Sequence, residues 1–133
     1  MGVPKETESS IDLPVSKDVA WRALTRAAGA DETRPGATWH LAHSDVAIDS
    51  ATPGEGAGGS GRWNGVDYRV AAHLVPQGAG RTLLLLTADP GVEQHGLAAE
   101  VRVSASHRHA RQALEALAAA TGRLIQSGDV GAR

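Results

Sequence analysis

Two groups of histidine and aspartate residues are spaced closely enough to be considered as metal sites. His40, His43 and Asp45 lie within six residues of one another. On an extended strand His43 and Asp45 share one face while His40 points to the other, so three ligands converge only if the strand bends. His107 and His109 begin a predicted helix, where a separation of two residues directs the side chains apart. We therefore expect ordinary solvated polar residues at both places and predict no metal site.

A second polar group, formed by Asp67, Arg69 and His73, has the composition of a catalytic set. Its members alternate with the apolar residues of the same stretch, so the two groups occupy opposite faces of a strand. If the apolar face lines the interior, the charged face meets water, and we expect cross-strand ion pairs there. The same argument applies to Glu100 and Arg102.

Sequence motifs for other chemistries are missing. There is no HExxH, no Ser-His-Asp pattern in a nucleophile-elbow context, and no glycine-rich loop that leads from a strand into a helix. The chain has no cysteine, which excludes disulfides, a thiol nucleophile and Cys-ligated metal centres. No cofactor is predicted.

Large aromatic residues are scarce, with three Trp, one Tyr and no Phe. Trp39, Trp63 and Tyr68 fall on predicted strands, and their apolar bodies with polar tips suit a ligand cavity. Filling of a packed core is the alternative explanation for each of them. Trp21, on a short predicted helix, is expected to seal that helix against the core.

The element around which these residues must be arranged is a long C-terminal helix, predicted from about His107 to Gln126. Small and apolar residues recur there at steps of three and four and form one stripe, with charged residues opposite. A single amphipathic helix needs a large partner, and the only one available is a sheet. The stripe comprises Ala110, Ala113, Leu114, Leu117, Ala118, Thr121, Leu124 and Ile125.

The remainder of the chain reads mainly as strands. Ser16 is a plausible N-cap for a short helix, and Asn64-Gly65 is the strongest hairpin signal. The segment 50–60, rich in Gly, Ser and Pro, is predicted to be a flexible loop over an opening. The predicted strands are 10–15, one or two within 38–49, 61–63, 66–75, 81–88 and 97–105, and the short helix is 17–28.

These elements predict an α+β fold in which a curved antiparallel β-sheet wraps around the long C-terminal α-helix. We expect one domain over residues 1–133, with a core from about 9 to 126 and loose ends. With 13 basic and 15 acidic side chains, neither nucleic acid nor a membrane surface is an expected partner. The first ten residues do not resemble a signal peptide, and the longest apolar run is Leu83–Leu86, so a cytoplasmic protein is expected.

The local sequence also resembles the START-like, or SRPBCC, superfamily, whose members have the helix-grip fold. "SIDLPVSKDVAWRALTRA" (Ser10–Ala27) is similar to the family's opening strand, loop and helix, with Trp21 and Leu24 in the apolar core of that helix. "GRWNGVDYRVAAHLVP" and "ARQALEALAAATGRLI" occupy the places of the central strands and the gripped helix. The resemblance extends from about Ser9 to Gln126.

The resemblance implies a cavity between the concave face of the sheet and the long helix. Family members include lipid and hormone binders, polyketide cyclases and aromatases, antibiotic self-resistance proteins and Hsp90 co-chaperone activators. The branch of ring-hydroxylating oxygenases is excluded, because its Rieske centre needs cysteines.

Our leading hypothesis is therefore binding of a hydrophobic, polycyclic or polyketide-like small molecule of secondary metabolism, as in antibiotic biosynthesis, by a monomer or homodimer. The Tyr68 hydroxyl or His43 would orient the ligand. The first alternative is a polyketide cyclase or aromatase in the same cavity, with Tyr68, His43 and Arg69 as catalytic candidates. The second is a protein-interaction module like the co-chaperone activators. The predicted cavity wall comprises Trp39, Trp63, Tyr68, Val70, Leu74, Leu84, Val101, Leu117 and Leu124.

Overall fold

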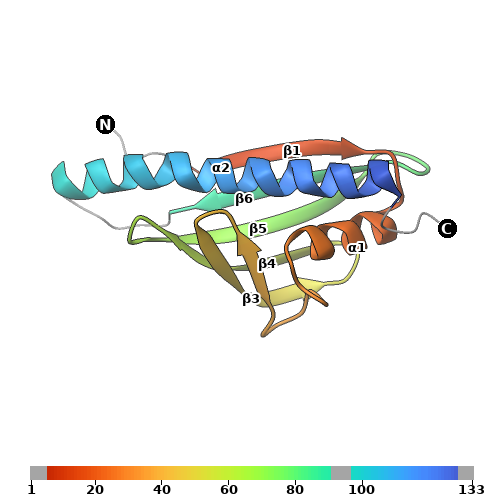
Figure 1. Cartoon of the computed structure of the whole chain (residues 1–133), viewed down its shortest axis with the longest axis horizontal. Helices are drawn as coiled ribbons and strands as arrows, with labels where there is room; N and C mark the ends of the chain where they lie inside the picture. The colour runs from red at the N-terminus through yellow and green to blue at the C-terminus, as the bar shows by residue number, and fades with distance from the viewer. Residues whose placement is uncertain (1–5, 91–96, 129–133) are drawn as a thin grey trace.

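A computed structural model of the chain describes residues 6–90 and 97–128, with the backbone alone described for 97–104. Over these residues a six-stranded antiparallel sheet curls beneath one long helix (Figure 1). The predicted α+β fold class and the helix-grip arrangement are thereby confirmed. The elements are β1 (Thr7–Leu13), α1 (Lys17–Ala27), β2 (Thr38–Leu41), β3 (Ser44–Thr52), β4 (Gly56–Trp63), β5 (Val66–Pro76), β6 (Thr82–Asp89) and α2 (Leu97–Ser127).

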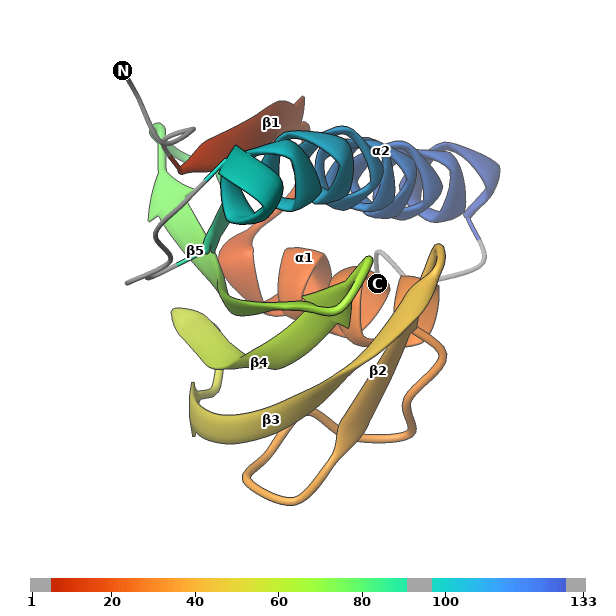
Figure 2. The same cartoon turned by 90° about the vertical axis from the view of Figure 1, so that its left-hand side faces the viewer.

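The strand order β1-β6-β5-β4-β3-β2 places the N-terminal strand at one edge and β2 at the other. β1 pairs along its whole length with β6, from Thr7 opposite Ala88 to Leu13 opposite Thr82. The five strands from β2 to β6 follow one another through antiparallel hairpins. Helix α2 packs against β1 and α1, and Figure 2 shows it crossing above the curled sheet.

Two local predictions hold in detail. Ser16 caps α1, with its hydroxyl accepting a hydrogen bond from the Val19 amide at 3.4 Å. Asn64 and Gly65 connect β4 to β5 with φ values of 51° and 77°. Both values lie in the left-handed region that a two-residue type I′ turn requires, so the Asn-Gly pair determines this hairpin.

The prediction of a flexible loop over residues 50–60 was wrong. β3 continues to Thr52, and β4 starts at Gly56 after a tight turn. The glycines here serve the curvature of the sheet: a Cβ on Gly59 would lie 2.3 Å from the carbonyl oxygen of Ala47. This close approach lies beside the bulge in β3 between Ile48 and Ser50, which bends the strand.

The predicted strand at 97–105 was also wrong, because this segment is the first part of α2. Its alternation of apolar and polar residues is short, and Leu, Ala, Glu and Arg are good helix formers. From Ala99 to Ala110 the sequence also permits steps of four, three and four residues. Extending the helix that follows is therefore more favourable than forming a short strand from the two-residue alternation.

The core lies between the concave face of the sheet and the two helices. Alternate residues of β5 and β6 point into it, and the stripe of α2 meets them. On the other face of β6, Leu83 and Leu85 are half-buried. The α2 residues in the core are Ala110, Ala113, Leu114, Leu117 and Ala118.

Candidate functional site

Most of the predicted cavity wall lies together on the concave face of the sheet, under α2. Six of these side chains come from β2, β4, β5 and β6, and none is more than 6% exposed. They touch one another in a single cluster, so they are brought together as predicted, in closely packed form. Their role in binding a ligand stays a prediction. The six are Trp39, Trp63, Tyr68, Val70, Leu74 and Leu84.

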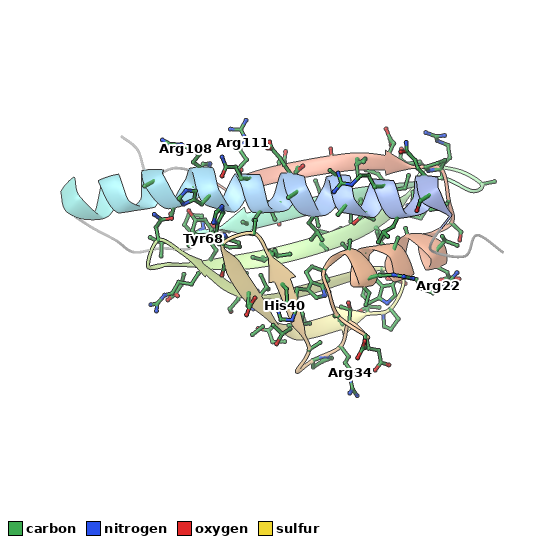
Figure 3. The ribbon with its side chains drawn as sticks, in the orientation of Figure 1. Arg22, Arg34, His40, Tyr68, Arg108 and Arg111 are labelled. Carbon is green, nitrogen blue, oxygen red and sulfur yellow. The ribbon has the colours of Figure 1, made fainter. Side chains whose placement is uncertain are left out.

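Trp63 and Tyr68 form the centre of this cluster. Their rings meet edge to face with centroids 5.5 Å apart, an arrangement that aromatic quadrupoles favour. The Trp63 indole donates a hydrogen bond to the carbonyl oxygen of Ala42 at 3.0 Å. The Tyr68 hydroxyl lies 2.7 Å from the hydroxyl of Ser106 on α2, and Figure 3 shows Tyr68 beneath that helix. Burial raises the pKa of Tyr68, and the hydrogen bond with Ser106 partly opposes that effect.

Trp39 is held in a similar way near the end of α1. Its indole donates to the hydroxyl of Thr33 at 3.0 Å, and Thr33 lies 2.7 Å from the hydroxyl of Thr25. Both threonines are buried. The polar tips of Trp39, Trp63 and Tyr68 are thus all engaged by the protein itself.

The open space next to this cluster lies at the β2 edge of the sheet. A hollow of about 240 Å³ lies between α1, the β2–β3 hairpin and α2, and we call it the α1–β2–α2 groove. A second hollow of about 480 Å³, between the C-terminal parts of α1 and α2, shares Ala27, Ala120 and Arg123 with it. The groove is lined by Ala27, His40, Leu41, Ala42, Ala113, Ala116, Leu117, Ala120 and Arg123.

The sequence prediction identified few of the residues that line these hollows. Leu117 lines the groove and Leu124 the second hollow. The side chain of Val101 lies outside the described part of the chain. The missed residues are mainly alanines, whose role depends on a gap between three elements and leaves no local pattern. Only the abundance of Ala in the last helix was a signal, and it is equally compatible with close packing.

The three catalytic candidates do not converge. Tyr68 points into the core, whereas Arg69 is the next residue of β5 and lies on the outer face. There its guanidinium forms a two-point contact with Asp49, with N–O distances of 2.5 and 2.6 Å. Hydrogen bonding between the two lowers the pKa of Asp49 and raises that of Arg69. His43 lies in the turn between β2 and β3.

The predicted solvated face of β5 with cross-strand ion pairs is confirmed. Arg62 and Asp67 pair across β4 and β5 at 3.0 Å, and Arg69 reaches Asp49 on β3. All four side chains are more than half exposed. Such pairs on a wet surface contribute little to stability, so this face has the character of ordinary solvated sheet.

The histidine groups differ from the sequence prediction. His40 and Asp45 are opposite each other in the β2–β3 pairing and form an ion pair of 3.1 Å, so they share a face. The prediction that His43 and Asp45 share a face was wrong, because His43 belongs to the hairpin turn with a φ of 66°. Among the described side chains, those of residues 6–90 and 105–128, no three His, Asp or Glu residues form a group that could hold a metal ion.

His107 and His109 are not simply solvated, contrary to prediction. The Nδ1 atom of His107 is buried and has no hydrogen-bond partner. Burial, and then the charge of Arg111, lower the pKa of His107. The ring of His109 lies 4.9 Å from that of His43, centroid to centroid, and its Nδ1 atom lies 2.6 Å from Oδ1 of Asn64.

Comparison with known proteins shows the fold and no closer relationship. No family model and no curated protein matches the chain. Among solved structures, the Zhui aromatase/cyclase from Streptomyces sp. R1128 is 16% identical, with a TM-score of 0.58 over 91% of this chain and 95% of that one. A START superfamily protein from Mycobacterium smegmatis is 12% identical, with a TM-score of 0.60 over 93% and 99%.

An HSP90 activator from Plasmodium falciparum is similar over a smaller part, 69% of this chain and 77% of its own, with 16% identity and a TM-score of 0.53. At these identities the likeness concerns the fold alone, which is the helix-grip fold that the sequence resemblance implied. Within the described residues, no helix is long and apolar enough to cross a membrane.

Proposed function

We propose that this protein binds a hydrophobic small molecule in the α1–β2–α2 groove. The observation that carries the proposal is the gap between α2 and the edge strand β2, which is lined mainly by alanine and leucine side chains. Ligand sites are concave and mostly apolar, with a few polar groups at defined positions. The helix-grip fold of proteins such as the Zhui aromatase/cyclase supports the same interpretation by analogy.

The energetics favour a compact aromatic ligand. A molecule that removes about 300 Å² of apolar surface from water gains roughly 7 kcal/mol before the free energy of immobilisation is subtracted. That gain corresponds to dissociation constants in the micromolar range or weaker. Entry into the groove alone leaves the packed cluster around Trp63 and Tyr68 in place, so no rearrangement of the core is needed.

The polar groups at the rim suggest the chemistry of the ligand. Arg123 lines both the groove and the second hollow. A guanidinium favours planar, acidic oxygen groups such as a carboxylate or a phenolate. A polycyclic phenol of the polyketide type combines such a group with an apolar body, which is the ligand class that we propose.

The test is a fluorescence titration with aromatic and polyketide-like compounds. Trp63 donates to the carbonyl of Ala42, which lines the groove, so a ligand bound there changes the environment of this tryptophan. In Ala116→Leu the larger side chain fills part of the groove. The matched control is Ala119→Leu, which places the same change on an exposed position of α2 that does not line it.

We expect saturable quenching in the wild type and in Ala119→Leu, with equal dissociation constants. Ala116→Leu should bind at least tenfold more weakly, because the groove has lost volume for the ligand. Equal binding by Ala116→Leu and Ala119→Leu would refute this location, and no response to any compound in the folded protein would refute the function.

Binding has more support than the two alternative functions. A cyclase needs an acid or base beside the bound substrate, and the candidates Tyr68, His43 and Arg69 point in different directions. An interaction module needs an exposed apolar patch. In the described part of the chain, Val75 is the only large hydrophobic residue that is substantially exposed. Incubation with a poly-ketone and analysis of the products distinguishes turnover from binding.

A further inference from the structure

Three segments that are distant in the sequence meet at one point beside α2. The turn between β2 and β3 carries His43, the turn between β4 and β5 carries Asn64, and α2 carries His109. Figure 1 shows the β2–β3 turn reaching the helix. His43 and Asn64 both adopt left-handed backbone conformations, with φ values of 66° and 51°, in the turns of paired hairpins.

The separation of the two imidazole rings lies in the range that two ligands of one ion have. Zn²⁺ lies about 2.0–2.1 Å from a coordinating nitrogen, so two imidazoles bound at angles of about 90–110° have centroids about 4.5–5.2 Å apart. The centroids of His43 and His109 are 4.9 Å apart and their planes are tilted by 33°.

The contact with Asn64 prepares His109 for this role. The amide oxygen of Asn64 can only accept a hydrogen bond, so Nδ1 of His109 carries the proton and donates it over 2.6 Å. In the neutral ring the lone pair is then on Nε2. Metal-binding histidines typically have this arrangement, in which the second ring nitrogen donates to an oxygen that orients the ring.

We propose that His43 and His109 bind one divalent transition-metal ion, Zn²⁺ or Cu²⁺, with Asn64 as the positioning residue. Imidazole nitrogens suit both ions, and two protein ligands leave the other positions to water or to an oxygen of a bound molecule. His43 is exposed and His109 is half-buried, so an ion reaches the pair directly from solvent. Ala42, next to His43, lines the α1–β2–α2 groove, but the metal site does not depend on the function proposed for the groove.

The experiment is calorimetric titration of the intact protein with Zn²⁺, repeated with variants that preserve the backbone. Glycine tolerates positive φ, so His43→Gly and Asn64→Gly remove a side chain without straining either turn. His109→Ala removes the second ligand from a helical position. His73→Ala is the control, because His73 is an exposed histidine on the outer face of β5.

We expect one Zn²⁺ per wild-type chain, the same affinity in His73→Ala, and losses of at least tenfold in His43→Gly and His109→Ala. Asn64→Gly should weaken binding by about 10–100-fold, as loss of a residue that orients a metal ligand does. Electron paramagnetic resonance with Cu²⁺ should show two imidazole nitrogens in the wild type and one in His43→Gly. Wild-type affinity in either histidine variant, or an unchanged nitrogen count, would overturn the proposal.

Discussion

The hydrogen bond between Tyr68 and Ser106 offers the sharpest test of how dry the interior is between the sheet and α2. Tyr68 is 2% exposed, and its hydroxyl lies 2.7 Å from that of Ser106, which is fully buried. Ser106 also takes part in a further interaction. The substitution Tyr68→Phe removes the tyrosine hydroxyl and leaves Ser106 with its further interaction. The substitution Ser106→Ala instead leaves the Tyr68 hydroxyl in an apolar cluster.

This asymmetry predicts the order of the stability losses. Tyr68→Phe should lower the free energy of unfolding by roughly 0.5–1.5 kcal/mol, the net value of one hydrogen bond. Ser106→Ala should lower it by about 1–3 kcal/mol, because a buried hydroxyl loses its partner. In the double variant that hydroxyl is gone, so the loss should be close to that of Tyr68→Phe, and the two single losses should fail to add by about 1–3 kcal/mol, the loss of Ser106→Ala.

Urea unfolding of the wild type, the two single variants and the double variant measures these losses. In thermal unfolding, each kcal/mol lost should lower the melting temperature by about 3–5 °C. The single tyrosine of the chain allows an independent assay, the absorbance of tyrosinate near 295 nm. Burial raises the pKa of Tyr68, so it should titrate above its usual value of about 10 in the native state and near that value in denaturant.

The linkage of this titration to stability has a definite sign. A raised native pKa means that the unfolded chain releases the proton first, so the stability contribution is complete below about pH 10 and is lost as the pH rises through the native pKa. Tyr68→Phe should abolish this alkaline loss. The reasoning would be refuted if Ser106→Ala lowered the free energy of unfolding by less than about 0.5 kcal/mol, or if the losses of the two single variants were additive. Either result would indicate water beside Tyr68, as in an open interior cavity.

Two further predictions concern the bend of the sheet and the start of α2. Gly59→Ala should lower the free energy of unfolding, measured in urea, by about 1–3 kcal/mol, because the added Cβ would meet backbone atoms of Ala47. Ser60→Ala, at the exposed neighbouring position, is the control. Equal stabilities of these two variants would contradict the argument. For His107, the lowered pKa means that the unfolded chain binds the proton first on acidification, so stability is complete above about pH 6.5 and is lost as the pH falls through the native pKa. His107→Gln should therefore flatten the dependence of melting temperature on pH between 8 and 4.5, whereas His73→Gln should not; parallel curves for the wild type and His107→Gln would be the contrary result.

Neither of the two proposed sites could be predicted from a local sequence pattern. The pairing of His43 with His109 joins residues 66 positions apart in the chain, through a turn and a helix. The groove depends on the distance between α2 and the edge strand, which no property of Ala116 or Ala120 predicts. Both features are consequences of how separate elements dock.

The elements that were predicted correctly are those that short-range interactions control. The hydroxyl of Ser16 caps α1, Asn64-Gly65 adopts the left-handed conformations of a tight hairpin, and the period of two in β5 separates a buried from a solvated face. The three- and four-residue steps of the last helix similarly required a sheet as partner. These rules act within a few residues, so they are readable from the chain, and together they specified the helix-grip fold.

Contacts between distant segments set the conformation of the regions in which the local sequence pattern conflicts with the surrounding structure. Residues 56–60 have the composition of a loop, yet pairing with β3 and β5 makes them part of the central strand β4, and Gly59 allows the bend there. Residues 97–105 alternate like a strand, yet they extend α2. In both cases the backbone hydrogen bonds offered by neighbouring structure outweigh a weak local preference, because the free energy of pairing or of helix continuation accumulates over many residues.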